Sequence, residues 1–126
     1  MAYVETFVSG REHAASAEAV GHGALFATVE GKGLMAHREP DDVVHTYAAF
    51  VKPEGWIKSV DFTERNKAVE TLTKEFIGWS PALTDLLTKA DVLVPRPFYT
   101  LPRDHAWTRT RGVTLLGDAA HLSIPA

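Results

Sequence analysis

Three short β-prone segments separated by two very short gaps constrain the fold of this chain most strongly. The segments cover residues 24–29 (ALFATV), 33–38 (GLMAHR) and 43–51 (VVHTYAAFV). The gaps between them are Glu30-Gly31-Lys32 and Glu39-Pro40-Asp41-Asp42. Parallel strands need a crossover connection of about a dozen residues or more, and neither gap has room for one. The sequence therefore predicts an antiparallel meander.

Further elements are expected on both sides of the meander. A weak alternation predicts a strand over 3–8, and a run of helix formers predicts a helix over 12–20. After the meander, apolar residues recur at the spacing of one helical face and end at Gly78. Asp61, with Glu64 three residues later, resembles a capping box and predicts the start of that helix.

A second helix is expected at Ser80-Pro81, with serine as the N-cap and proline at the first helical position. Its buried side is expected to carry Leu83, Leu86 and Leu87. Both helices should pack on one face of the sheet. Pro95 and Pro97 interrupt the pattern, and residues 98–101 are expected to form a further strand.

The end of the chain, GVTLLGDAAHLSIPA, predicts a buried strand over 113–116 that runs into a Gly117-Asp118 turn, after which a helix should follow. A glycine lets a ligand approach the backbone, and a neighbouring carboxylate accepts hydrogen bonds from hydroxyl groups such as those of a ribityl chain. The alternative is an ordinary strand-to-helix turn, because Gly-Asp is also common turn chemistry.

Residues 116–121 (LGDAAH), followed by Pro125, resemble the Gly-Asp motif of the FAD-dependent aromatic hydroxylases, the group A flavoprotein monooxygenases. The tetracycline-inactivating and polyketide-modifying members are the most similar. The resemblance implies that Asp118 accepts hydrogen bonds from the FAD ribityl hydroxyls within a turn that includes Gly117 and Ala119. It also implies that Pro125 lies near the isoalloxazine ring and that NAD(P)H serves as co-substrate.

The resemblance continues over residues 31–50 and 52–56, which are similar to the middle-domain hairpin of the tetracycline-modifying flavin monooxygenases. It places His45 where that family uses a histidine to bind its substrate, with Met35 and His37 at neighbouring substrate-lining positions. Methionine replaces an aromatic residue there and histidine replaces an amide. The resemblance therefore implies an aromatic or polyketide-like substrate without identifying it.

Strand alternation places Met35 and His37 on one face of their strand, and His45 and Tyr47 on one face of theirs. If His37 pairs with His45, the connecting loop has an odd length and all four residues share a face. A loop of two or four residues would put the pairs on opposite faces. For each histidine singly, a local hydrogen bond is the alternative to a role in substrate binding.

Composition excludes several other classes of function. The net charge of −3 without a basic run gives no general attraction to nucleic acid or acidic membranes. The absence of cysteine excludes disulfides and thiolate sites, and the six histidines form no compact ligand motif, so no metal site is expected. No signal peptide or membrane-spanning run is evident, which predicts a cytoplasmic protein.

We therefore expect an α+β fold, an antiparallel sheet covered on one face by helices, with a C-terminal strand belonging to a Rossmann-like FAD-binding layer. Residues 1–110 would form a substrate-binding middle domain, and 111–126 the strand and Gly-Asp motif of an incomplete FAD-binding domain. The predicted function is that of a fragment of an FAD-dependent monooxygenase, inactive alone and without a catalytic residue of its own. The alternative is a standalone, non-catalytic small-molecule-binding domain that self-associates through its exposed sheet.

Overall fold

An open, five-stranded antiparallel sheet with the strand order β2-β3-β4-β1-β5 forms the centre of the molecule. The computed structural model describes residues 1–123. The strands are β1 (Ala2–Ser9), β2 (Ala24–Val29), β3 (Lys32–Glu39), β4 (Val43–Phe50) and β5 (Val92–Pro97). The predicted meander is confirmed as β2-β3-β4, and the predicted α+β class is confirmed with it.

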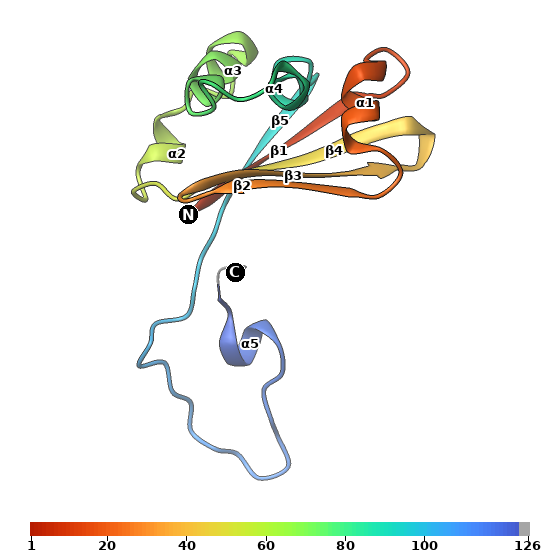
Figure 1. The fold of residues 1–126 in the computed structure, drawn as a ribbon. Coiled ribbons are helices and arrows are strands. Elements are labelled where there is room, and N and C mark those ends of the chain that lie inside the picture. Colours follow the sequence, from red (N-terminus) through yellow and green to blue (C-terminus); the bar gives the residue numbers. More distant parts are fainter. Residues whose placement is uncertain (124–126) are drawn as a thin grey trace.

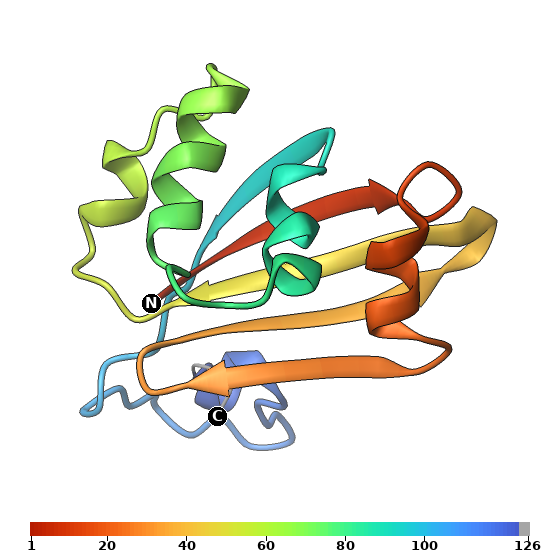
Figure 2. The same cartoon turned by 45° about the horizontal axis from the view of Figure 1, so that its top comes forward.

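The helices of the first ninety residues lie on one face of the sheet (Figure 1), and the turned view in Figure 2 shows the same arrangement. They are α1 (Ala14–Val20), α2 (Trp56–Ser59), α3 (Arg65–Lys74) and α4 (Pro81–Thr88). The expected packing of helices on one face is therefore confirmed. The other face of the sheet, which we call the open face, carries no helix of this layer.

The core lies between the sheet and the helices because alternate strand residues point toward the helical layer. Its larger cluster joins sheet residues such as Val4, Leu34 and Phe50 to Leu72 and Phe76 of the helical side. A second cluster joins Val8, Ala36 and Val44 to Ala17, Val20, Leu86 and Ala90. This division of each strand into a buried row and an open row decides which side chains are available for function.

The two helix starts predicted from sequence have different outcomes. Ser80 caps α4 as predicted, since its hydroxyl accepts a hydrogen bond from the Ala82 amide at 3.3 Å. The capping box at Asp61 is wrong, because α3 begins at Arg65 and its N-cap residue, Glu64, makes no side-chain cap. The Asp61 carboxylate instead accepts hydrogen bonds from the amide and hydroxyl of Thr63, a local turn that competes with helix formation.

The expected strand over 98–101 is also wrong, because β5 lies earlier and includes both prolines. Among residues 1–123, β5 is an edge strand that pairs only with β1, where Pro95 lies opposite Val4 and Pro97 opposite Ala2. A proline has no amide hydrogen to donate, but an edge strand needs donors on one side only. The prolines therefore do not prevent pairing at this position.

The buried strand expected over 113–116 does not form. These residues belong to no ladder, and Val113 and Leu116 are 55% and 78% exposed. A strand of this kind needs neighbours on both edges and cover on both faces, and no described strand pairs with it. The helix expected after the turn is present as the four-residue α5 (Asp118–His121), which lies on the side of the sheet opposite the helical layer (Figure 1).

Some predictions about the chain end stay predictions. Pro125 lies outside the described residues, and the division between 1–110 and 111–126 is not tested by the structure. Within residues 1–123, no helix has both the length and the apolar character needed to cross a bilayer.

Candidate functional site

The pairing of β3 with β4 decides the register that the sequence left open. His37 lies directly opposite His45, and Met35 lies opposite Tyr47. The connection is the 3-residue turn Pro40–Asp42, so the loop is odd in length. All four predicted substrate-binding residues therefore share one face, the open face of the sheet.

Local contacts of the turn fix this register. Asp41 and Asp42 both have a φ of 62°, a left-handed conformation that aspartate tolerates better than most residues. The Gly10 amide donates to the Asp42 carbonyl at 2.7 Å, and the Asp42 side chain forms an ion pair with Arg38. The turn is therefore anchored both to the chain after β1 and to its own hairpin.

Aromatic rings form a connected group on the open face. His45, only 7% exposed, stacks on Phe7 with ring centroids 4.3 Å apart and contacts the Tyr47 ring at 4.4 Å. Tyr3 continues the group, because its ring centroid lies 6.2 Å from that of Tyr47 and 4.4 Å from that of Phe98. Such a surface offers ring faces and edges to a planar ligand.

Two carboxylates lie among these rings. His45 Nδ1 lies 2.8 Å from Glu39 Oε1, and His37 Nε2 lies 3.3 Å from the same oxygen. On the other side of the His45 ring, Nε2 lies 3.6 Å from Glu5 Oε2, while Arg96 Nε donates to Glu5 Oε1 at 2.9 Å. The hydrogen bond from His45 lowers the pKa of the Glu39 carboxyl and keeps it ionised.

The same surroundings act on Tyr47 in the opposite direction. Burial raises the pKa of its phenol, and the negative charges of Glu5 and Glu39 raise that pKa further. Tyr47 therefore keeps its proton at neutral pH and is able to donate a hydrogen bond.

An apolar hollow of about 290 Å³ lies beside these residues on the open face. Its lining combines Tyr3, Ala24, Phe26, Met35, Ala36, His37 and Tyr47. Phe26, on the edge strand β2, is 72% exposed. Three of the four predicted substrate-binding residues line the hollow, and the fourth, His45, packs beneath its neighbours Tyr47 and His37.

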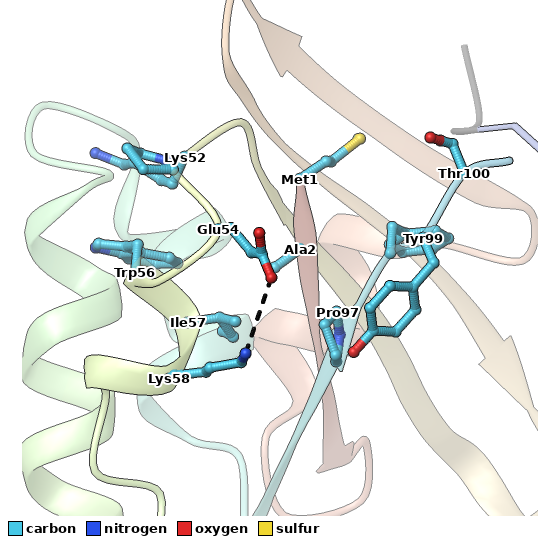
Figure 3. A pocket seen from close by; sticks show the side chains of 12 residues that line it. Met1, Ala2, Lys52, Glu54, Trp56, Ile57, Lys58, Pro97, Tyr99 and Thr100 are labelled. Atoms are coloured by element: carbon cyan, nitrogen blue, oxygen red, sulfur yellow. Dashed lines mark ion pairs between the residues drawn. The ribbon is translucent and has the colours of Figure 1, made fainter. Parts of the chain in front are cut away.

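A second cavity, of about 330 Å³, lies where the start of β1 meets α2 and the end of β5 (Figure 3). Its charged side chains are already paired: Lys58 lies 3.9 Å from Glu54, and Lys52 lies 2.7 Å from Glu75. Lys52 also lies over the Trp56 ring. With its charges neutralised locally, this cavity offers less to a ligand than the open face does.

The predicted cofactor residues lie apart from the sheet, around α5 (Figure 1). Gly117, Asp118 and Ala119 are exposed, and Gly117 has a φ of 55°, where a side chain would be strained. The Leu101 amide donates to the Leu122 carbonyl at 3.1 Å and ties α5 to the segment that leaves β5. The Asp118 carboxylate and the Gly117 backbone are exposed to solvent, so both are accessible to hydroxyl groups of a ligand.

Comparison with known proteins supports a relationship to flavin enzymes. No protein-family model matches the chain. This chain is 30% identical over 112 residues to an FAD-dependent urate hydroxylase of Mycolicibacterium vanbaalenii. The match covers 86% of this chain, which spans only 27% of the length of that curated relative. The chain is therefore similar in sequence to one part of an FAD-dependent hydroxylase.

Sequence reasoning missed two acidic members of the site, Glu5 and Glu39. Glu39 carried a usable signal, because it lies two residues after His37 and so shares its face in an extended strand. Glu5 reaches the histidines only because β1 pairs with β4, with Glu5 opposite Tyr47. That long-range pairing left no local trace in the sequence.

Proposed function

We propose that this chain is the substrate-binding part of an FAD-dependent monooxygenase that hydroxylates an aromatic or polyketide-like small molecule with NAD(P)H and oxygen. The observation that carries the proposal is the shared face of Met35, His37, His45 and Tyr47, in a chain related in sequence to an FAD-dependent hydroxylase. The tetracycline-modifying resemblance of the same hairpin supports the aromatic or polyketide-like class.

The side chains of the open face support a planar, oxygen-rich ligand. The hollow beside Met35 and Phe26 supplies apolar contact, and the Tyr47 phenol and His37 imidazole supply hydrogen-bonding groups at its wall. His45 is held from both sides, by the Phe7 ring and by the Glu39 carboxylate. We therefore assign His45 the role of fixing ligand position rather than that of an acid or base.

The cofactor would be held on the C-terminal side of the chain. Asp118 would accept hydrogen bonds from ribityl hydroxyls, with Gly117 and Ala119 leaving the backbone accessible. Bound FAD supplies the redox chemistry, with NAD(P)H as reductant, and the protein supplies orientation and exclusion of water. Because these residues are exposed to solvent, we expect this chain alone to retain no flavin absorbance after gel filtration. Retained flavin would contradict that part of the proposal.

Ligand binding to the 126-residue chain tests the proposal directly. Urate and tetracycline serve as the two probes, in separate titrations followed by ¹H–¹⁵N NMR in the presence of EDTA. At least one probe should shift the amides of β3 and β4 around His37 and Tyr47, and should leave the helical layer unchanged. His45→Ala should weaken that binding, whereas the exposed control His22→Ala should not. Shifts confined to the helices, or none with either probe, would refute it.

A further inference from the structure

The hairpin β3-β4 brings three ligand atoms of metal-binding type together at one point of the open face. They belong to His37, Glu39 and His45, and these atoms all lie within 4.8 Å of one another. The grouping depends on the register, since His37 and His45 are cross-strand partners and Glu39 follows His37 by two residues. The sequence contains no linear motif for this set because its members come from two strands.

Two of the three separations between these atoms are close to those of a coordination shell, and the third is at most 4.8 Å. His45 Nδ1 and His37 Nε2 lie 2.8 and 3.3 Å from Glu39 Oε1. Around zinc, with bonds of about 2.0–2.2 Å in a tetrahedral arrangement, neighbouring ligand atoms lie roughly 3.3 Å apart. An ion could therefore enter between the three groups with only small side-chain movements.

A second observation concerns the other ring nitrogen of His45. Its imidazole is nine-tenths buried, and within residues 1–123 its Nε2 has no hydrogen-bond partner. To donate to Glu39, the ring must carry its proton on Nδ1, which in the neutral ring leaves the Nε2 lone pair facing the Glu5 carboxylate 3.6 Å away. A cation at Nδ1 would reverse this arrangement, because the proton would then reside on Nε2 and point toward Glu5.

Glu5 is positioned to accept a hydrogen bond from that Nε2 proton. It is held in place by Arg96, whose Nε donates to Glu5 Oε1 at 2.9 Å. Metal-binding histidines usually direct their other ring nitrogen to a carboxylate of this kind, which fixes the tautomer and raises ligand basicity.

We propose that His37, Glu39 and His45 form a binding site for a divalent transition-metal ion of the zinc class, with Glu5 as the carboxylate that orients His45. Two imidazoles and one carboxylate favour zinc-class ions over magnesium or calcium, which prefer oxygen ligands. Three protein ligands leave a coordination position open for water or an added molecule. The site lies next to the apolar hollow, because His37 belongs to both.

The proposal does not depend on the proposed function. The metal alone is the probe, whereas the ligand titrations are carried out in EDTA, so either result can fail without the other. A metal held by His37 and His45 would occupy the imidazole nitrogens that face the Glu39 carboxylate.

Titration calorimetry with Zn²⁺ and absorption spectra with Co²⁺, at pH 7.5, test the site on the full chain. We expect one ion per chain, the intense visible absorption of low-coordinate Co²⁺, and no comparable binding of Mg²⁺. Glu39→Gln and His37→Ala should each weaken Zn²⁺ binding by 10-fold or more, and Glu5→Gln should weaken it by about 10–100-fold. Both Glu→Gln changes preserve side-chain shape and keep the test valid if His37→Ala does not fold.

Imidazole ¹⁵N NMR identifies the atoms. Zn²⁺ should shift the resonances of His37 Nε2 and His45 Nδ1 and place the His45 proton on Nε2. The exposed His22 and His105 serve as controls, and His22→Ala and His105→Ala should leave affinity unchanged. Binding that survives Glu39→Gln and His37→Ala unchanged, shifts at the control histidines instead, or no binding by the wild-type chain would each overturn the assignment.

Discussion

Two buried threonines that face each other across β1 and β4 give the sharpest test of how the helical layer is attached to the sheet. Thr6 and Thr46 are cross-strand partners, and both are 0% exposed. The Thr6 hydroxyl donates to the Leu86 carbonyl at 2.8 Å, whereas the Thr46 hydroxyl has no hydrogen-bond partner among residues 1–123. Replacing each by valine keeps the side-chain shape and exchanges the hydroxyl for a methyl group.

The Leu86 carbonyl lies in the last turn of α4, where carbonyl groups lack a partner within the helix. The Ala90 amide, which could have reached it, donates to Leu87 instead. Thr6→Val would leave this carbonyl buried and unsatisfied, a loss of about 1–3 kcal/mol, partly offset by roughly 0.8 kcal/mol from the added methyl group. Thr46→Val removes an unsatisfied hydroxyl and should stabilise the fold by about 1 kcal/mol.

Urea denaturation followed by circular dichroism and tryptophan fluorescence measures both changes. We expect the free energies of unfolding of the two variants to move in opposite directions and to differ by about 2 kcal/mol. The denaturant slopes should stay equal to that of the wild type, which shows that only stability has changed. Equal shifts in the same direction would refute the reasoning, because the two sites would then not differ in hydrogen bonding.

Two further predictions concern a helix cap and a surface carboxylate. Ser80→Ala should lower the free energy of unfolding by about 1 kcal/mol, measured by urea denaturation, because it removes the acceptor for the Ala82 amide; Ser80→Asp should largely restore it, and equal loss in both variants would argue against capping. The pKa of Glu39 is lowered by its hydrogen bond from His45, so its stabilising contribution is complete above the ordinary value of 4.5 and is lost as pH falls through the lower folded-state value. Unfolding measured in EDTA from pH 6 to 3 should therefore show a steeper loss of stability in the wild type than in Glu39→Gln, and parallel curves would contradict this.

Local patterns predicted most of the sheet and one helix start, because those features depend on neighbouring residues. The short gaps alone required β2, β3 and β4 to be antiparallel, and Ser80-Pro81 located the start of α4. The failures concern segments whose state depends on distant partners. β5 forms around Pro95 because β1 is available on one side, and residues 113–116 stay unpaired because no described strand accompanies them.

The candidate site was predictable to the same extent. Alternation placed the four predicted substrate-binding residues in two pairs. The 3-residue turn that unites them depends on left-handed conformations at Asp41 and Asp42 that no Asn-Gly or Asp-Gly signal indicated. Glu5 required knowledge of the pairing between β1 and β4. The sequence therefore indicated the hairpin as the candidate functional element, whereas the charged groups beside its histidines became visible only in the fold.

The two prolines of β5 also make the two edges of the sheet unequal as partners for a further strand. Successive residues of a strand direct their amides to opposite sides. Pro95 and Pro97 are two residues apart, so both lie on the same side of β5. Two positions on that side therefore lack a hydrogen-bond donor. The opposite edge, β2, contains no proline and carries the exposed Phe26 and Val29. A further strand, whether from another copy of this chain or from a different protein, would therefore find a full set of donors at β2 and an incomplete one at β5. Growth of this sheet by edge pairing is asymmetric.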